Sequence, residues 1–253
     1  MSNGRPTLRL PLRQLTQLSI YWFGINAIWG GLNIVLQERV PDLAGPGQAG
    51  RALAVLDIFA VGIAILVQPT VGSISDYTIS RWGRRKPYIA IGSVLDVVFL
   101  IGIATSQSYL SILAFVVLLQ FSSNFAQGPF QGYLPDLVPA RQVATASAMV
   151  GVMSILGVVG GTVIVSTGYA LGDWAIPTII LGVVELATAI GTLLWVEDGR
   201  QPKDRGGRSW AAIARETWGM DVFAHRGFVW LVASRLCVLA GRPRRPASRP
   251  CVT

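Results

Sequence analysis

Six long apolar stretches separated by short polar segments constrain this 253-residue chain more than any other feature of its sequence. A helix needs about 20 apolar residues to cross the hydrocarbon core of a bilayer, and each stretch has about that length. Only 13% of the residues are charged, whereas soluble domains carry about 25%, which argues against a water-soluble bundle. We therefore predict an all-α membrane protein with spans at Thr16–Leu36, Ala52–Ile74, Tyr88–Thr105, Tyr109–Leu134, Ala144–Thr167 and Trp174–Val196.

The remaining segments predict the organisation around this six-helix transmembrane domain, which we place at residues 16–196. Residues 1–15 form an N-terminal tail, and the basic, polar residues 197–226 form a linker. Residues 227–241 are apolar but too short for a complete seventh span. The basic tail at 242–253 would lie on the wrong side of the membrane if a seventh span crossed. We therefore expect a truncation or frameshift near Arg235 to Gly241.

The loops differ in their content of Lys and Arg, and this difference predicts the orientation of the chain. One side holds only Arg39 and Arg51. The other side holds Arg5, Arg9, Arg13, Arg81, Arg84, Arg85, Lys86, Arg141 and the basic residues of the linker. Because cytoplasmic loops carry such an excess, we expect a multi-pass protein of the cell (inner) membrane with its N-terminus and linker in the cytoplasm.

A motif of glycines and charged residues joins the second and third spans. Gly72 permits two helices to approach closely, and Asp76 follows one helical turn later. Asp76 can accept hydrogen bonds from a nearby arginine and from a helix N-terminus, and so hold this side of the bundle closed. The alternative is that the arginines only fix the topology. The predicted cytoplasmic gate comprises Gly72, Asp76, Arg81, Gly83, Arg84, Arg85 and Asp136.

This segment resembles the loop signature of the major facilitator superfamily. Its similarity to the sucrose–proton and glycoside symporter branches lies in Gln68–Gly72, Ser75–Asp76, Gly83–Pro87, Gln127–Pro129 and Asp136–Leu137. The resemblance implies one six-helix half of a twelve-helix transporter, whose first and fourth spans line a central cavity. Sucrose symporters carry an arginine, implicated in substrate binding, where this chain has Gln131. This departure argues against sucrose itself and against its proton-coupled mechanism.

Polar residues recur at helical spacing in the first and fourth spans, so each set lies on one helix face. A polar side chain facing lipid is costly, which predicts that both faces point into the bundle or a wet cavity. Amides bond hydroxyl groups and indoles cover the apolar face of a sugar, so we predict a pathway for a sugar or glycoside. The alternative is that the amides only join helices. The predicted pathway comprises Trp22, Asn26, Trp29, Asn33, Gln120, Asn124, Gln127 and Gln131.

Three carboxyl groups, those of Asp57, Asp96 and Glu185, fall inside the predicted spans. An ionisable residue within a membrane is a functional candidate by default. These residues are our candidates for coupling to a proton or sodium gradient, with Asp96 and Glu185 ranked above Asp57, which lies nearer the outer face. The alternative for each acid is a structural hydrogen bond to a neighbouring helix.

The fifth span carries Gly151, Gly157, Gly160 and Gly161. Small residues let transmembrane helices approach closely, so we expect this span to pack tightly against a neighbour. Antiporters of the superfamily usually carry a proline after such glycines. The absence of that proline favours symport.

Two functions remain open at the level of sequence. The first is secondary active transport of a small polar solute by alternating access, with a proton or sodium ion, lipid and a second six-helix half as partners. The second is a transport-inactive half or a membrane helper subunit. An enzyme is not predicted, because the chain has no nucleophile motif, metal-ligand cluster or cofactor motif, and its one histidine, His225, lies in the linker. Dispersal of the basic residues over the loops disfavours a nucleic-acid partner.

Overall fold

Helices form almost all of the chain that the computed structural model describes, namely residues 9–45 and 47–197 and isolated positions between 206 and 234. They are α1 (Leu12–Ala44), α2 (Ala49–Asp76), α3 (Lys86–Thr105), α4 (Tyr109–Gln131), α5 (Tyr133–Leu137), α6 (Val143–Ala170) and α7 (Ala175–Trp195), with a 3₁₀ turn at Ala140–Gln142. Six segments are long and apolar enough to cross a membrane, which confirms the predicted all-α, six-span fold. The predicted linker, seventh span and tail fall almost wholly outside the described residues.

Helix α1 extends beyond its apolar stretch at both ends. It begins at Leu12 rather than Thr16 and continues through Pro41 to Ala44. Its 33 residues give a length of about 50 Å, whereas the hydrocarbon core is about 30 Å thick. The last turns carry Glu38, Arg39 and Asp42. The hydropathy of the sequence therefore predicted the apolar part of α1 and not the full length of the helix.

The predicted fourth span is interrupted near its end. Helix α4 stops at Gln131, and the short helix α5 starts at Tyr133. A continuous helix would need the N–H of residue 135 to bond the carbonyl of Gln131, but residue 135 is a proline and has no N–H. The chain therefore turns at Gly132, and Asp136 lies in a separate helical turn.

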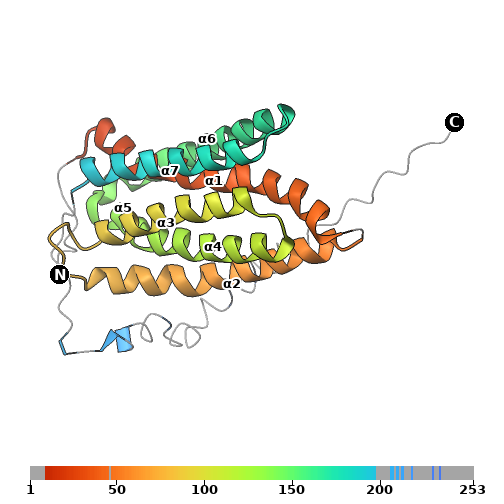
Figure 1. Ribbon diagram of the computed structural model, residues 1–253. Helices are drawn as coiled ribbons and strands as arrows, with labels where there is room; N and C mark the ends of the chain where they lie inside the picture. Colours follow the sequence, from red (N-terminus) through yellow and green to blue (C-terminus); the bar gives the residue numbers. More distant parts are fainter. Residues whose placement is uncertain are drawn as a thin grey trace. The chain divides into compact units, whose positions relative to one another are not determined.

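The six spans pack side by side, and neighbours in space are often distant in sequence (Figure 1). Helix α1 packs against α6 and α7, α2 packs against α4, and α3 lies against both α4 and α7. The alternating directions place the starts of α1, α3 and α6 at the same end of the bundle as the ends of α2, α5 and α7. We call this end the Asp76 end and the opposite end the Arg39 end.

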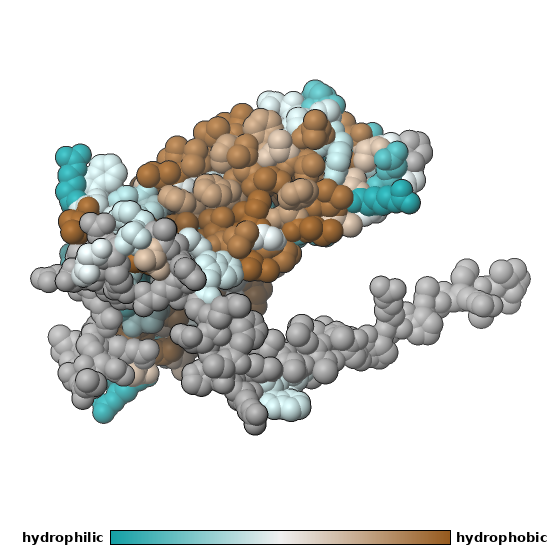
Figure 2. Space-filling view, turned by 90° about the horizontal axis from the view of Figure 1, so that it is seen from below, coloured by the Kyte–Doolittle hydropathy of each residue, from teal (hydrophilic) through white to brown (hydrophobic). Residues whose placement is uncertain are grey.

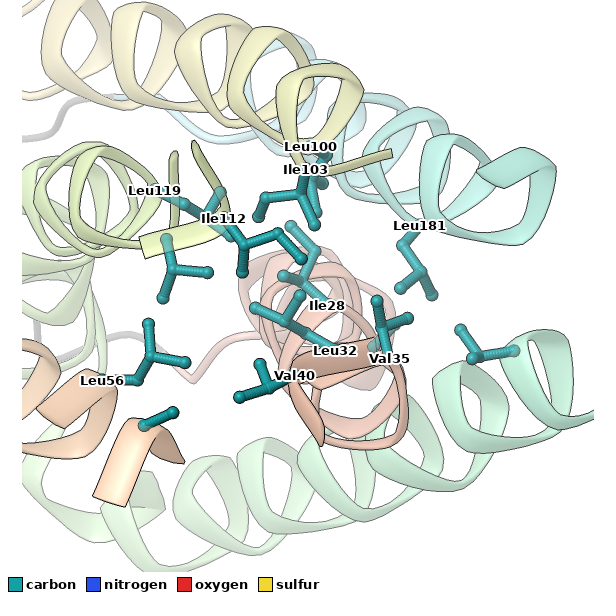
Figure 3. Packing of buried hydrophobic residues seen from close by; sticks show 14 residues of the cluster. Ile28, Leu32, Val35, Val40, Leu56, Leu100, Ile103, Ile112, Leu119 and Leu181 are labelled. Carbon is teal, nitrogen blue, oxygen red and sulfur yellow. The ribbon is translucent and has the colours of Figure 1, made fainter. Parts of the chain in front are cut away.

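Aliphatic side chains fill the interior toward the Arg39 end. Ile28, Leu32 and Val35 of α1 meet side chains from α3, α4 and α7, including Leu100 and Leu181 (Figure 3). A second cluster lies toward the Asp76 end, where aromatic rings join the aliphatic residues: it includes Leu15, Tyr21, Ile25, Ile89, Phe130 and Tyr133.

Large apolar side chains also cover the outside of the bundle. Ile91 on α3 and Val183 on α7 are 53% and 57% exposed. Figure 2 shows one face on which hydrophobic residues gather over the helices, with hydrophilic residues toward the ends. Soluble monomers rarely expose contiguous apolar surface on this scale, whereas a lipid environment requires it. Helices α2 and α6 bury the least of their length within the bundle.

Glycines on α6 and α1 bring these two helices into close backbone contact. A Cβ atom placed at Gly161 would collide with the carbonyl of Ala27, and one at Gly157 would collide with the carbonyl of Phe23. At Gly30, the backbone of Val158 occupies the same space. Gly157 and Gly161 therefore permit the tight packing predicted for the fifth span, whereas no atom lies within 4 Å of the Cβ position of Gly151.

Candidate functional site

The loop between α2 and α3 is shaped to bring two arginines back over the end of α2. Helix α2 ends at Asp76, and α3 begins at Lys86 with Pro87 in its first turn. Between them, Gly83 adopts φ +106°, a backbone conformation that side chains rarely permit. The loop therefore folds back, and the side chains of Arg84 and Arg85 are only 5% exposed.

Four charged side chains form a network of ion pairs at this end of the bundle. Arg85 Nη2 donates to Asp76 Oδ1 at 2.7 Å and lies 2.8 Å from Asp136 Oδ2. Arg84 forms an ion pair with Asp136, and its Nη1 lies 3.8 Å from Asp76 Oδ1. Two cations therefore balance two anions, and this charge cluster ties α2, the α2–α3 loop and α5 together. Its members are Asp76, Arg84, Arg85 and Asp136.

Small residues make room for the charge cluster. A Cβ atom at Gly72 would lie 3.2 Å from the carbonyl oxygen of Gly128, so α2 and α4 nearly touch at this crossing. At Gly132, a Cβ atom would collide with the guanidinium group of Arg85. The close approach expected at Gly72 is therefore present, and Gly132 is a contributor that the sequence motif did not indicate.

Arg81 stands apart from the other residues of the predicted gate. Its side chain is exposed, and its guanidinium carbon lies 5.6 Å from the ring centre of Trp82. The ion pairs formed within the described part of the chain involve Arg84 and Arg85 instead. Gly72, Asp76, Gly83, Arg84, Arg85 and Asp136 thus assemble at one place, without Arg81.

The polar stripe of α1 makes its hydrogen bonds within its own helix. Asn26 Nδ2 donates to the carbonyl of Trp22 at 2.7 Å, and Asn33 Nδ2 donates to the carbonyl of Trp29 at 3.2 Å. Trp22, Asn26 and Trp29 are half-buried, whereas Asn33 is exposed. These two amides do not join helices, which is the alternative role considered for them.

On α4, the members of the polar stripe differ in their partners. Asn124 is buried and donates to the carbonyl and the side-chain oxygen of Gln120, at 2.7 and 3.2 Å. Gln127 instead accepts a bond of 3.3 Å from Gln68 on α2, so this residue does join two helices. Gln131, at the end of α4, is exposed. Among the described residues, no hydrogen bond connects the α1 stripe to the α4 stripe.

A cavity of about 240 Å³ lies between α1, the α4–α5 junction and α6. It brings together Trp22 and Gln131, one residue from each predicted stripe. The Trp22 ring lies 5.7 Å from that of Phe130. The lining comprises Leu18, Trp22, Phe130, Gln131, Tyr133, Leu134 and Val150. Among the residues that the structure describes, no charged side chain lines the cavity, so its aromatic rings and its amide suit a neutral molecule.

The two acids ranked highest in the sequence meet in the interior. Asp96 of α3 and Glu185 of α7 are both 0% exposed, and their carboxyl groups are electrostatic neighbours. Ser122 of α4 donates to Asp96 Oδ1. Tyr21 of α1 and Ser93 of α3 donate to Glu185 Oε1 at 2.9 and 3.0 Å. We call Tyr21, Ser93, Asp96, Ser122 and Glu185 the acid site.

Asp57, the third candidate acid, lies elsewhere. Its side chain is exposed on α2, and it forms no ion pair with any residue that the structure describes. Sequence reasoning missed the hydroxyl partners of the other two acids. Ser93 precedes Asp96 by one turn, and this local signal was available, but Tyr21 and Glu185 are 164 positions apart.

Six apolar spans define a multi-pass integral membrane protein. The charge cluster lies at one end of its bundle, and a mostly apolar cavity lies between its helices. The sequence profile of the Major Facilitator Superfamily matches residues 15–241, and the chain belongs to this family of transporters.

Comparison with individual proteins gives similarity to parts of longer chains. The chain is 31% identical over 153 residues to a membrane-associated transporter protein of Homo sapiens, covering 53% of this chain and 27% of that protein. It is 33% identical over 107 residues to sucrose transport protein SUT1 of Oryza sativa subsp. japonica (34% and 20% covered). With sucrose transport protein SUC3 of Arabidopsis thaliana, it is 31% identical over 132 residues (44% and 22% covered). The chain thus spans about a quarter of the length of these relatives.

Proposed function

We propose that this protein carries a small, neutral, hydroxyl-rich solute, a sugar or glycoside, across the membrane by alternating access. The observation that carries the proposal is the cavity that joins Trp22 of α1 to Gln131 of α4 and has no charged lining residue. An indole ring can stack on the apolar face of a sugar, and an amide can both donate to and accept from hydroxyl groups. The similarity to two sucrose transport proteins supports the same class of solute.

The charge cluster is, on this proposal, the gate that holds the cytoplasmic end closed. Asp76 and Asp136 sit on α2 and α5, and Arg84 and Arg85 bind both carboxylates. Separating α2 from α5 requires these charge-assisted bonds to break together. The excess of basic residues at the Asp76 end supports a cytoplasmic position for it.

Alternating access also needs an opposing wall, since two bundles rock about a site between them. Helices α2 and α6 leave most of their surface uncovered by the other spans. We therefore propose that a second six-helix half packs against α2 and α6 and completes the pathway.

Uptake into proteoliposomes tests the proposal. The purified chain is reconstituted, and entry of labelled monosaccharides, disaccharides and glycosides is followed under an imposed proton or sodium gradient. We expect gradient-driven uptake of at least one of these solutes above that of protein-free liposomes. Replacing Trp22 by Ala should lower uptake about tenfold, because the loss of one aromatic contact of about 1.4 kcal/mol has that effect.

Trp195 provides the matched control, because it is an exposed tryptophan at the end of α7 and does not line the cavity. Trp195→Ala should leave uptake within twofold of the original protein. If the folded chain takes up none of these solutes, the transport proposal is wrong for the chain alone. Recovery of uptake on adding a second six-helix half would then identify the chain as an inactive half.

A further inference from the structure

We propose that Asp96 and Glu185 form a buried proton-binding site in which the two carboxyl groups share a single proton. The site lies where α1, α3, α4 and α7 meet, and both side chains are 0% exposed. The contacts of these side chains support the proton-binding site itself. Its role in coupling a proton to transport rests on the proposed transport function.

The hydrogen bonds of the site leave one oxygen of each acid without a donor. The hydroxyl of Ser122 reaches Asp96 Oδ1, and the hydroxyls of Tyr21 and Ser93 reach Glu185 Oε1. Asp96 Oδ2 and Glu185 Oε2 are buried, and no donor among the described residues reaches them. A carboxylate carries no hydrogen, so two ionised acids cannot satisfy each other. One proton between the two groups supplies the missing donor.

The charge balance of the surroundings requires the same proton. The titratable groups that face the site from the four helices are Tyr21 on α1, Asp96 on α3 and Glu185 on α7, while α4 contributes the neutral Ser122. The ion pairs formed within the described residues all lie in the charge cluster. Two adjacent buried anions without a cation are strongly unfavourable, and a shared proton leaves one negative charge, which the surrounding hydroxyl groups stabilise.

The available oxygens favour a proton over a metal cation. A hard cation such as Ca²⁺ or Mg²⁺ requires about six oxygen ligands. Here the hydroxyl groups of Tyr21, Ser93 and Ser122 contact one oxygen of each carboxyl group, and the Tyr21 and Ser93 hydroxyls also lie 2.7 Å from each other. Two carboxyl oxygens remain, which is enough to hold a proton and too few to coordinate a hard metal ion.

Aromatic rings connect this site to the cavity. Phe130 lines the cavity, and Tyr21 packs edge-on against it with the ring centres 4.8 Å apart. The hydroxyl group of Tyr21 in turn donates to Glu185. A change in the protonation of Glu185 therefore acts on Tyr21 directly and on a cavity wall through one further contact, which is the arrangement that coupling of a proton to a solute needs.

Infrared spectroscopy of the purified chain in lipid nanodiscs tests the proposal. A protonated carboxyl group has a carbonyl stretch that is separate from those of amides and carboxylates and shifts in D₂O. We expect one such band at neutral pH, lost in Asp96→Asn and in Glu185→Gln, which preserve size and hydrogen-bonding capacity. Asp57→Asn, in an exposed acid of α2, is the matched control and should leave the band unchanged.

Absence of the band from the original protein at neutral pH would overturn the proposal. Its loss in Asp57→Asn alone would do the same, and so would its disappearance when sodium chloride is added at constant pH. If one variant does not fold, as judged by its helical circular dichroism, the other still assigns the band. Because the spectrum does not depend on solute movement, a shared proton without uptake would contradict the transport proposal and leave the proton site intact.

Discussion

The two arginines of the charge cluster are buried, whereas Arg81 in the same loop is exposed. Arg84 and Arg85 have side chains that are 5% exposed, and each reaches both Asp76 and Asp136. An ion pair in water contributes little to stability, but removal of one partner from a buried pair leaves the other charge uncompensated. The stability of this end of the bundle should therefore depend on these two side chains.

Replacing Arg85 by Ala should destabilise the folded protein by about 3 kcal/mol, because Asp76 and Asp136 would each lose a buried ion-pair partner. Thermal unfolding of the detergent-solubilised protein, followed by circular dichroism, measures the effect. Arg81→Ala is the control, since Arg81 is exposed and contacts Trp82, and its effect should stay within about 0.5 kcal/mol. Equal losses in the two variants would show that burial of Arg85 is not what stabilises the loop.

The backbone conformation of Gly83 shapes the loop that carries Arg84 and Arg85. Its φ of +106° is unfavourable for any residue with a Cβ atom, so Gly83→Ala should cost about 1–2 kcal/mol. Gly62, in the middle of α2 with open space around it, should respond with the opposite sign, because alanine stabilises a helix by about 0.5–1 kcal/mol relative to glycine. The same unfolding measurement compares the two, and a stabilising Gly83→Ala would contradict the loop geometry.

At the scale of elements, the contact between α1 and α6 shows how small residues replace hydrophobic burial as the basis of helix association in lipid. Lipid tails are as apolar as leucine, so packing at short distance must hold such helices together. Gly157 and Gly161 allow the backbone of α6 to meet the carbonyls of Phe23 and Ala27. An added methyl group at Gly157 or Gly161 would clash with these carbonyls.

Gly161→Ala should therefore destabilise the bundle by roughly 1–3 kcal/mol, the usual effect of overpacking. Gly151→Ala, on the same helix, should be neutral or slightly stabilising, because nothing lies within 4 Å of its Cβ position. Midpoints of unfolding in a denaturing detergent titration compare the two variants. A similar response from both would mean that α6 is not held against α1 as described.

The elements that the sequence predicted are those set by local pattern. Apolar length located all six spans, and the spacing of four and three placed Trp22, Asn26 and Trp29 on one face of α1. Contacts between distant positions could not be read in the same way. The bond between Gln68 and Gln127, the meeting of Tyr21 with Glu185 and the exclusion of Arg81 from the charge cluster all depend on how the helices pack.

On the scale of the whole molecule, the two ends of the bundle differ in charge. The described part of the Asp76 end carries Arg9, Arg13, Arg81, Arg84, Arg85, Lys86 and Arg141, and the Arg39 end carries Arg39 and Arg51. Two of the basic residues at the Asp76 end are neutralised by aspartates, and the others are free to favour the cytoplasmic side.

This asymmetry predicts which loops a reagent outside the cell can reach. In a background with Cys237 and Cys251 replaced by serine, Trp82→Cys should react with an impermeant maleimide only after the cells are broken. Gln107→Cys, in the exposed loop between α3 and α4 at the opposite end, should react in intact cells. The reverse pattern would invert the orientation and remove the cytoplasmic assignment of the charge cluster.

Protection of a single cysteine tests the central claim that a solute occupies the space between α1 and the end of α4. Val150→Cys, in the same cysteine-free background, places a thiol in the cavity wall and keeps Trp22 and Gln131. A sugar that the protein carries should slow maleimide labelling of this thiol at least fivefold, and it should leave labelling of Gln107→Cys unchanged. If solutes that are taken up give the thiol at position 150 no protection, they do not pass through this cavity.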